Sequence, residues 1–238
     1  MIRPSLRKMD KIRPISMETN INKWAEGSCL IKIGGTQVIC TASVEPNQPL
    51  WKRQQNKTGG WVSAEYSMLP RAVDIRKGRE AIARDHRSSE ISRLIGRSIR
   101  SVVDMEKLGK NTITIDCDVI QADGGTRCAS ITGGFVALSL AVKKLLESGR
   151  IRENPISDYV AAVSAGIRNG EMILDLDFEE DCGAELDANF VLSGNGNFIE
   201  IQATGEEHPF TQEQLLGLME LSKAGCKKII DLQKQVLE

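Results

Sequence analysis

Residues 112–147, TITIDCDVIQADGGTRCASITGGFVALSLAVKKLLE, decide the fold. In residues 112–120 apolar side chains alternate with polar ones, a pattern that predicts a half-buried β-strand. The pair Gly124-Gly125 predicts a tight turn, and residues 131–146 follow a helical apolar pattern that ends near Gly149. The stretch therefore predicts a strand, a glycine-rich turn and a helix in succession.

Further strands and helices are predicted on both sides of this stretch. The first half has a hairpin at 27–44, a strand at 61–66, polar loops at 46–60 and 71–86, and a helix from Ser89. The second half has strands at 159–167, 172–178, 185–193 and 198–203. Thr211 and Gln214 form a capping box that opens a long C-terminal helix. We expect an α+β fold with mixed sheets.

Composition limits the class of protein. The chain has 238 residues, 41% of them hydrophobic, which is enough for one large domain or two small ones. No apolar run approaches the roughly 18–20 residues of a membrane span, and the basic N-terminal segment lacks the apolar block of a signal peptide. The six cysteines form no C-x-x-C pair, so neither structural zinc nor disulfides are expected. We predict a cytoplasmic protein.

The nearly neutral net charge hides a separation of charge along the chain. Residues 71–100 contain nine Arg or Lys and four acids, whereas residues 171–190 contain eight acids and no Arg or Lys. Such segregation indicates a surface for a polyanion in one place and a cation site in another. A solvated surface with internal ion pairs is the alternative interpretation.

The turn Gly124-Gly125-Thr126-Arg127 is a candidate phosphate-binding site. A helix N-terminus presents unpaired backbone N–H groups and a partial positive charge, and glycines allow an anion to approach the backbone. Arg127 adds a guanidinium suited to phosphate oxygens, and Arg87 could reach an anion from the start of the preceding predicted helix. The alternative for the turn is that its glycines serve only tight packing. The alternative for Arg87 is an ordinary surface residue.

The acidic run in residues 174–187 is a candidate cation site. Asp175 and Asp177 lie on one face of the predicted strand 172–178, and Asp181 and Asp187 flank a short turn. Mg²⁺ is commonly bound by one or two carboxylates together with water and substrate phosphate oxygens. The combination of a phosphate-binding turn, a carboxylate pair and a basic loop indicates phosphoryl chemistry on a polyanion. A solvated acidic turn is the alternative.

Four segments carry a family resemblance that extends from about Lys11 to the C-terminus. They are WVSAEYSMLPRA (61–72), RSSEISRLIGRSIRSVVD (87–104), TITIDCDVIQADGGTRCASITG (112–133) and LDLDFEEDCGAELDANFV (174–191). With these segments the chain resembles the ribonuclease PH family of phosphate-dependent 3′-to-5′ exoribonucleases, which trim tRNA precursors. The resemblance implies one domain over residues 1–238, built from two β-α-β-α-like halves as in the second domain of ribosomal protein S5.

The resemblance also implies roles for individual residues. Arg87, Gly125, Thr126 and Arg127 match the family's phosphate-binding positions, and Asp181 and Asp187 match its catalytic carboxylates, which are associated with Mg²⁺. Arg71, Arg76 and Arg79 match basic positions that hold tRNA. The implied reaction releases nucleoside 5′-diphosphates reversibly, with inorganic phosphate as co-substrate. The implied partners are tRNA precursors and other RNA 3′ ends, with a role in rRNA processing and a homohexamer built as a trimer of dimers.

Two departures from the family pattern stand near these residues. Ser5-Leu6-Arg7 replaces an Asp-Gly-Arg, and His86 replaces the glycine before the phosphate-binding arginine. Two other functions compete with an active exoribonuclease. One is a catalytically silent RNA-binding ring subunit of the exosome type, which would tend to lose the arginines or aspartates that are retained here. The other is a small-molecule phosphatase or nucleotidyl enzyme, which the basic loop disfavours.

Overall fold

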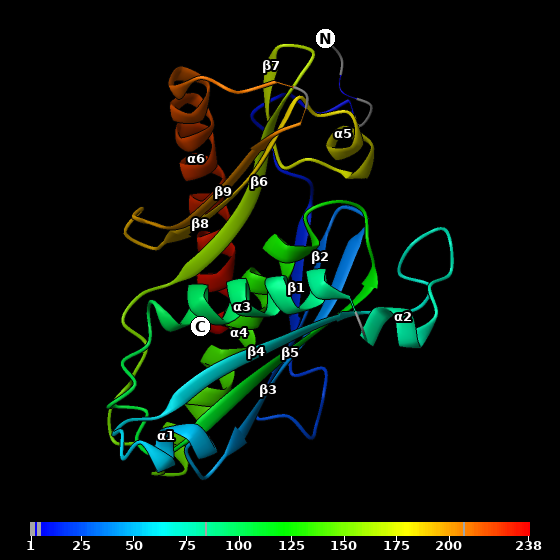
Figure 1. Cartoon of the computed structure of the whole chain (residues 1–238). Helices are drawn as coiled ribbons and strands as arrows, with labels where there is room; N and C mark the ends of the chain where they lie inside the picture. The colour runs from blue at the N-terminus through cyan, green and yellow to red at the C-terminus, as the bar shows by residue number, and fades with distance from the viewer. Residues whose placement is uncertain (1–2, 4–5, 84, 207) are drawn as a thin grey trace.

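The computed structural model describes residues 3, 6–83, 85–206 and 208–238. Two sheets and two long helices stack in alternate layers, with a third helix beside the first sheet (Figure 1). In chain order the elements are β1 (Ile15–Thr19), β2 (Gly27–Ile33), β3 (Thr36–Glu45), α1 (Leu50–Gln54), β4 (Trp61–Met68), α2 (Arg79–Ala83), α3 (His86–Arg100), β5 (Thr112–Gln121), α4 (Thr126–Glu147), β6 (Val160–Arg168), β7 (Glu171–Leu174), α5 (Phe178–Cys182), β8 (Leu186–Ser193), β9 (Phe198–Gly205) and α6 (Gln212–Leu237).

The first sheet has the strand order β1-β2-β3-β5-β4 and is mixed, because β4 runs parallel to β5 while the other neighbours are antiparallel. The alternating apolar residues of β5 face α4, which packs across β2, β3 and β5, and α3 covers β4. Because β4 and β5 are parallel, their carboxyl ends reach the same edge of the sheet. This edge leads directly into the turn at Gly124-Gly125.

The second sheet has the order β7-β6-β8-β9, and all of its pairings are antiparallel. Strand β6 is buried on both faces, which explains its nearly continuous apolar sequence. Val160, Ala162 and Val191 join the core around α4, while alternate residues such as Ala161 and Phe190 pack with α6. The predicted α+β class is therefore confirmed, whereas mixed pairing occurs only in the first sheet.

Several element boundaries differ from the sequence-based prediction. Helix α3 begins at His86 instead of Ser89, because the Asp85 carboxylate caps it by accepting from the backbone N–H of Arg87. Helix α4 begins at Thr126, five residues earlier than its apolar pattern suggested. Two polar loops hold the short helices α1 and α2. The capping box at Thr211 and Gln214 is present as predicted.

Helix α4 is the central element of the molecule. It is long and apolar enough to cross a membrane by length and composition, in contrast to the sequence-based prediction, but 72% of that window is buried inside the protein. Its residues contact both sheets, and its amino end lies where the two sheets approach each other. The helix therefore fixes the position of the turn that precedes it.

Candidate active site

A cavity of about 540 Å³ opens at the amino end of α4. Six candidate residues from distant parts of the sequence line it: Arg87, Gly125, Thr126, Arg127, Asp181 and Asp187. They come from the first turns of α3 and α4, from α5 and from the beginning of β8. Both halves of the chain are therefore needed to form the site.

The phosphate-binding turn is fixed by backbone contacts. Gly124 and Gly125 have φ values of 74° and 67°, in the left-handed region that favours glycine. A Cβ on Gly124 would lie 2.6 Å from the carbonyl oxygen of Leu176. The Thr36 hydroxyl donates to the carbonyl oxygen of Gly124 (2.6 Å) and accepts from the backbone N–H of Asp123 (2.9 Å). The turn is thus shaped by packing and also presents the first N–H groups of α4, which have no intrahelical acceptor.

Two helix N-termini and two guanidinium groups meet at the cavity. Arg87 lies in the first turn of α3, and Arg127 in the first turn of α4. The Arg127 guanidinium donates to Oε1 of Gln202 (2.7 Å) and lies 3.5 Å from a Glu90 carboxylate oxygen. The Thr126 hydroxyl lies 2.9 Å from that of the buried Tyr66. Positive charge and N–H donors are thus concentrated at this end of the cavity, as an anion site requires.

Asp181 and Asp187 line the same cavity from the second half of the chain. Burial raises the pKa of both carboxyl groups, and the proximity of Asp181 contributes to the pKa of about 6 for Asp187. Arg87 and Arg127 act in the opposite direction on both pKa values, so the two arginines and the two carboxylates share one electrostatic environment. Oδ1 of Asp187 is buried and has no hydrogen-bond partner in the described structure. A carboxylate in this state is suited to a cation.

The other two acidic residues have a structural role that the sequence did not predict. The predicted strand 172–178 is wrong, because β7 ends at Leu174 and Asp175 adopts a left-handed φ of 56°. Asp177 is the N-cap of α5 and forms a capping box with Glu180. Asp175 and Asp177 therefore do not share the face of a strand.

Arg13 connects the two halves of the site. It is buried, and its guanidinium donates to both Asp175 carboxylate oxygens (2.7 and 3.0 Å) and to the carbonyl oxygens of Asp123, Gly124 and Leu176. Burial acts to lower the pKa of Arg13, but the hydrogen bonds that Arg13 donates to Asp175, together with the charges of Asp175 and nearby carboxylates, outweigh it and raise that pKa above its ordinary value. Arg13 therefore positions the phosphate-binding turn against the segment that leads into α5. A lone arginine near the N-terminus gave no sequence signal for this role.

The three arginines predicted to hold tRNA lie outside the cavity. Arg71, Arg76 and Arg79 are exposed, and Arg76 and Arg79 line a separate shallow hollow. Their segment projects beyond the end of β4 together with α2 (Figure 1), and it contributes Val73, Asp74 and Lys77 to the cavity wall. On α3, Arg97 pairs with Glu200 (2.8 Å) and Arg100 donates to the carbonyl oxygen of Val62, so these two arginines are engaged within the chain.

Other lining residues escaped the sequence analysis. Asn189 and Ser164 line the cavity on the face of the second sheet that points to α4, and Phe178 lines it from the first position of α5. Alternation along β8 contained a signal for Asn189, which lies two residues beyond Asp187 on the same face. Ser164 interrupts the apolar run of β6. Among the described residues, no group of three or more His, Cys, Asp or Glu is arranged to hold a metal.

The two departures from the family pattern differ in their effect on the backbone. His86 is the first residue of α3 and has no left-handed conformation, so replacement of glycine creates no backbone strain there. Leu6, which replaces a glycine, has a φ of 56°, in the left-handed region that is unfavourable for a leucine. Arg7 is held in place, because it donates to the Asp175 and Glu180 carboxylates. Ser5 lies outside the described residues. The six cysteines are free thiols, and five of them are buried.

Sequence comparison identifies the family. Models of the 3′ exoribonuclease family match residues 11–144 as its domain 1 and residues 158–225 as its domain 2. The chain belongs to the 3′ exoribonuclease family. It is 53% identical over 238 residues to the protein named Ribonuclease PH of Caulobacter vibrioides, covering 99% of each chain. It is 50% identical over 235 residues to that of Methylocella silvestris, covering 98% of each. Organisation as a single domain remains a prediction.

Solved structures of low sequence identity share the fold. Rrp46 of rice (Oryza sativa) superposes with a TM-score of 0.81 at 19% identity, covering 99% of this chain and 100% of that one. A chain of the Archaeoglobus fulgidus exosome with RNA bound to the active site gives 0.80 at 22% identity, covering 96% and 91%. Family membership and the fold confirm the predicted enzyme class, a phosphate-dependent 3′ exoribonuclease that transfers nucleotidyl groups.

Proposed function

We propose that this protein trims the 3′ ends of tRNA precursors by phosphorolysis, with inorganic phosphate as the attacking group. The observation that supports it is the convergence of Arg87, Arg127, the glycine turn and two carboxylates on one cavity of about 540 Å³. A cavity for phosphorolysis must accept an entering phosphate beside a phosphodiester that is already anionic. Cationic groups and carboxylates that line one cavity meet that requirement.

The cationic end binds and aims the entering phosphate. The guanidinium groups of Arg87 and Arg127 and the N–H groups at the start of α4 offset the repulsion between the two anions. Fixed on two helix N-termini, they hold one phosphate oxygen in line with the terminal phosphodiester. That oxygen forms a bond to phosphorus as the bond to the neighbouring 3′-oxygen breaks. The 3′-oxygen takes up a proton, and the terminal nucleotide leaves as a 5′-diphosphate.

The carboxylate wall fits a hard divalent cation such as Mg²⁺. Asp181 and Asp187 supply two oxygen ligands, and the unpartnered Oδ1 of Asp187 is the atom that most needs a counter-charge. Two carboxylates are a sufficient protein contribution when substrate phosphate oxygens and water complete the coordination. When bound, Mg²⁺ would neutralise charge on the phosphodiester and on the leaving oxygen. Because a phosphodiester is exchanged for a diphosphate, the reaction runs readily in both directions.

Substrate holding and assembly belong to the same proposal. Arg71, Arg76 and Arg79 are exposed beside the cavity, a placement that suits contacts with tRNA phosphates away from the reacting end. Other RNA 3′ ends, including those of rRNA precursors, would enter in the same way. We further propose a cytoplasmic homohexamer, arranged as a trimer of dimers. Light scattering would then give six times the chain mass of 26.2 kDa.

An exosome-type silent subunit is the alternative. The likeness to exosome chains rests on about 20% identity and concerns the fold alone. A silent subunit has no need of both arginines and both aspartates in one cavity, whereas this chain brings all four together.

The test is the identity of the released nucleotide. A tRNA with extra 3′ nucleotides is incubated with and without inorganic phosphate, and the products are separated by chromatography. Phosphorolysis predicts nucleoside diphosphates, formed only when phosphate is present. Nucleoside monophosphates would indicate hydrolysis, and no product would indicate a silent subunit; either outcome contradicts the proposal.

A further inference from the structure

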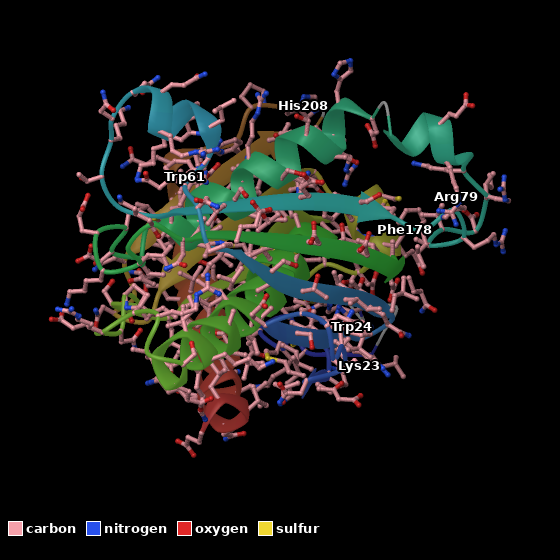
Figure 2. The ribbon with its side chains drawn as sticks, turned by 90° about the horizontal axis from the view of Figure 1, so that it is seen from below. Lys23, Trp24, Trp61, Arg79, Phe178 and His208 are labelled. Carbon is pink, nitrogen blue, oxygen red and sulfur yellow. The ribbon has the colours of Figure 1, made fainter. Side chains whose placement is uncertain are left out.

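Phe178 is an exposed aromatic residue in the wall of the cavity. Its side chain is 59% exposed, although a phenylalanine normally gains stability from burial. Figure 2 places it at the end of the molecule that also carries Arg79. Among the described residues it belongs to none of the hydrophobic clusters that form the core. Packing within the chain therefore does not explain its presence.

The helix that carries Phe178, α5, is anchored to the protein by hydrogen bonds of its other residues. Asp177 and Glu180 form the capping box of α5, and the buried Glu180 carboxylate accepts two hydrogen bonds from Arg3 (2.6 and 2.7 Å). The ring projects from the first position of this helix, on the side away from the buried glutamate. A side chain displayed from an anchored backbone loses little further freedom on binding a ligand. The arrangement suits a preformed contact surface.

The position of the ring relative to the proposed chemistry is specific. Phe178 and Asp181 are three residues apart on α5, so their side chains are neighbours on one helix face, about 5–6 Å apart at Cβ. Asp181 faces the reacting phosphates in the proposed mechanism. At this separation from Asp181, the ring would contact the nucleoside that is attached to the reacting phosphate. The flat face of a nucleoside that suits an aromatic ring is its base.

We propose that Phe178 is a stacking platform for the base of the 3′-terminal nucleotide. This inference rests on the proposed phosphorolytic function and adds the contact that seats the nucleotide to be removed. A phenyl ring offers no hydrogen-bonding group, so it accepts all four bases alike. An enzyme that removes successive nucleotides needs such tolerance. None of the other described residues that line the cavity is aromatic; apart from the apolar Met68, Val73 and Ala122 they are glycines or polar and charged residues.

The test compares substrates with and without the terminal base. The probes are a short oligoadenylate and the same oligomer ending in an abasic ribonucleotide that keeps its hydroxyl groups. Phe178→Ala should lower kcat/KM for the oligoadenylate about tenfold, mainly through KM, because stacking on an aromatic side chain is lost. Phe178→Tyr should stay within about twofold of wild type. On the abasic oligomer wild type and Phe178→Ala should be equally slow.

Two comparisons separate base stacking from a general loss of activity. Trp24 is 82% exposed and lies outside the cavity lining, so Trp24→Ala should behave as wild type on both oligomers. Equal losses of Phe178→Ala on both oligomers would mean that the ring contacts sugar or protein, and would overturn the stacking role. Unchanged activity of Phe178→Ala on oligoadenylate would also overturn it. The proposed function is tested separately, by wild type on the tRNA precursor, and fails there if no nucleoside diphosphate is released.

Discussion

The walls of the cavity and the neighbouring arginine segment, residues 71–79, are built in different ways. Thr126 is buried and bonded to Tyr66, and Asp187 lies in a central strand of the second sheet. Arg71, by contrast, is exposed, and its guanidinium donates to the carbonyl oxygen of Asp74 within its own loop. Thr126 and Asp187 are thus fixed by the core, whereas the arginines assigned to holding RNA are attached to its surface. The difference implies that catalysis and RNA affinity can be separated by mutation.

Removal of one carboxylate should have the largest effect on activity. Asp187→Asn keeps the shape of the side chain but weakens a site for a hard cation. We expect a loss in kcat of about a thousandfold or more, because the charge stabilisation supplied by a metal is worth several kcal/mol. The measurement is single-turnover phosphorolysis across a range of Mg²⁺ and Mn²⁺ concentrations. A metal-independent rate in both enzymes would exclude the metal role.

The same variant has a predictable pH dependence of stability. The pKa of Asp187 is about 6 in the folded protein, above its ordinary value of 3.8. Between these pH values the folded state retains a proton that the unfolded chain releases, so rising pH removes stability across this window. An asparagine does not titrate, so the Asp187→Asn variant does not lose stability in this way and should be at least as stable as wild type at pH 7. Thermal unfolding of both proteins at pH 4 and pH 7 checks this prediction. A smaller loss of stability between these pH values in wild type than in the variant would contradict it.

Loss of the guanidinium at position 127 should have the next largest effect. Arg127→Ala removes a charge clamp for the entering phosphate, with an expected loss of about a hundredfold in kcat and a weaker dependence on phosphate. Arg93→Ala provides a matched control, because Arg93 is an exposed arginine on α3 that does not line the cavity. Near-normal turnover of Arg127→Ala at saturating phosphate would remove Arg127 from the reaction.

Breaking the ion pair between Arg13 and Asp175, which links the two halves of the site, should reduce stability strongly and activity moderately. Asp175→Asn leaves the buried Arg13 cation without its anion, which should cost about 3 kcal/mol in the free energy of unfolding. Activity should fall by about tenfold at temperatures where the variant is folded, as the turn loses its position. Asp231→Asn, on the exposed side of α6, is the control. Urea unfolding of both variants measures the difference, and equal stabilities would show that Arg13 and Asp175 are not coupled.

The sequence predicted those parts of the site that follow from local patterns. Alternation in residues 112–120 and the glycines at 124 and 125 located β5 and its turn. The acidic run indicated Asp181 and Asp187 as a cation site, and the family resemblance added their catalytic role. The start of α4 was predicted too late, because no apolar pattern marks its first helical turn. That part of the helix is defined by the glycine pair before it and by the cavity that it lines. The bond between Arg13 and Asp175 joins residues 162 positions apart, and no local pattern encodes such a contact.

The smallest expected effect on catalysis is also the most informative, because it tests directly whether chemistry and RNA holding are separate. The triple variant Arg71→Ala/Arg76→Ala/Arg79→Ala is compared with wild type on a tRNA precursor and on a short oligonucleotide confined to the cavity. We predict a raised KM for the precursor, with kcat nearly unchanged and equal rates on the oligonucleotide. The slope of log affinity against log salt should also shrink by roughly 0.7–0.9 for each lost phosphate contact. Equal losses on the two substrates would contradict this separation and would place the arginine segment in the reaction itself or in assembly.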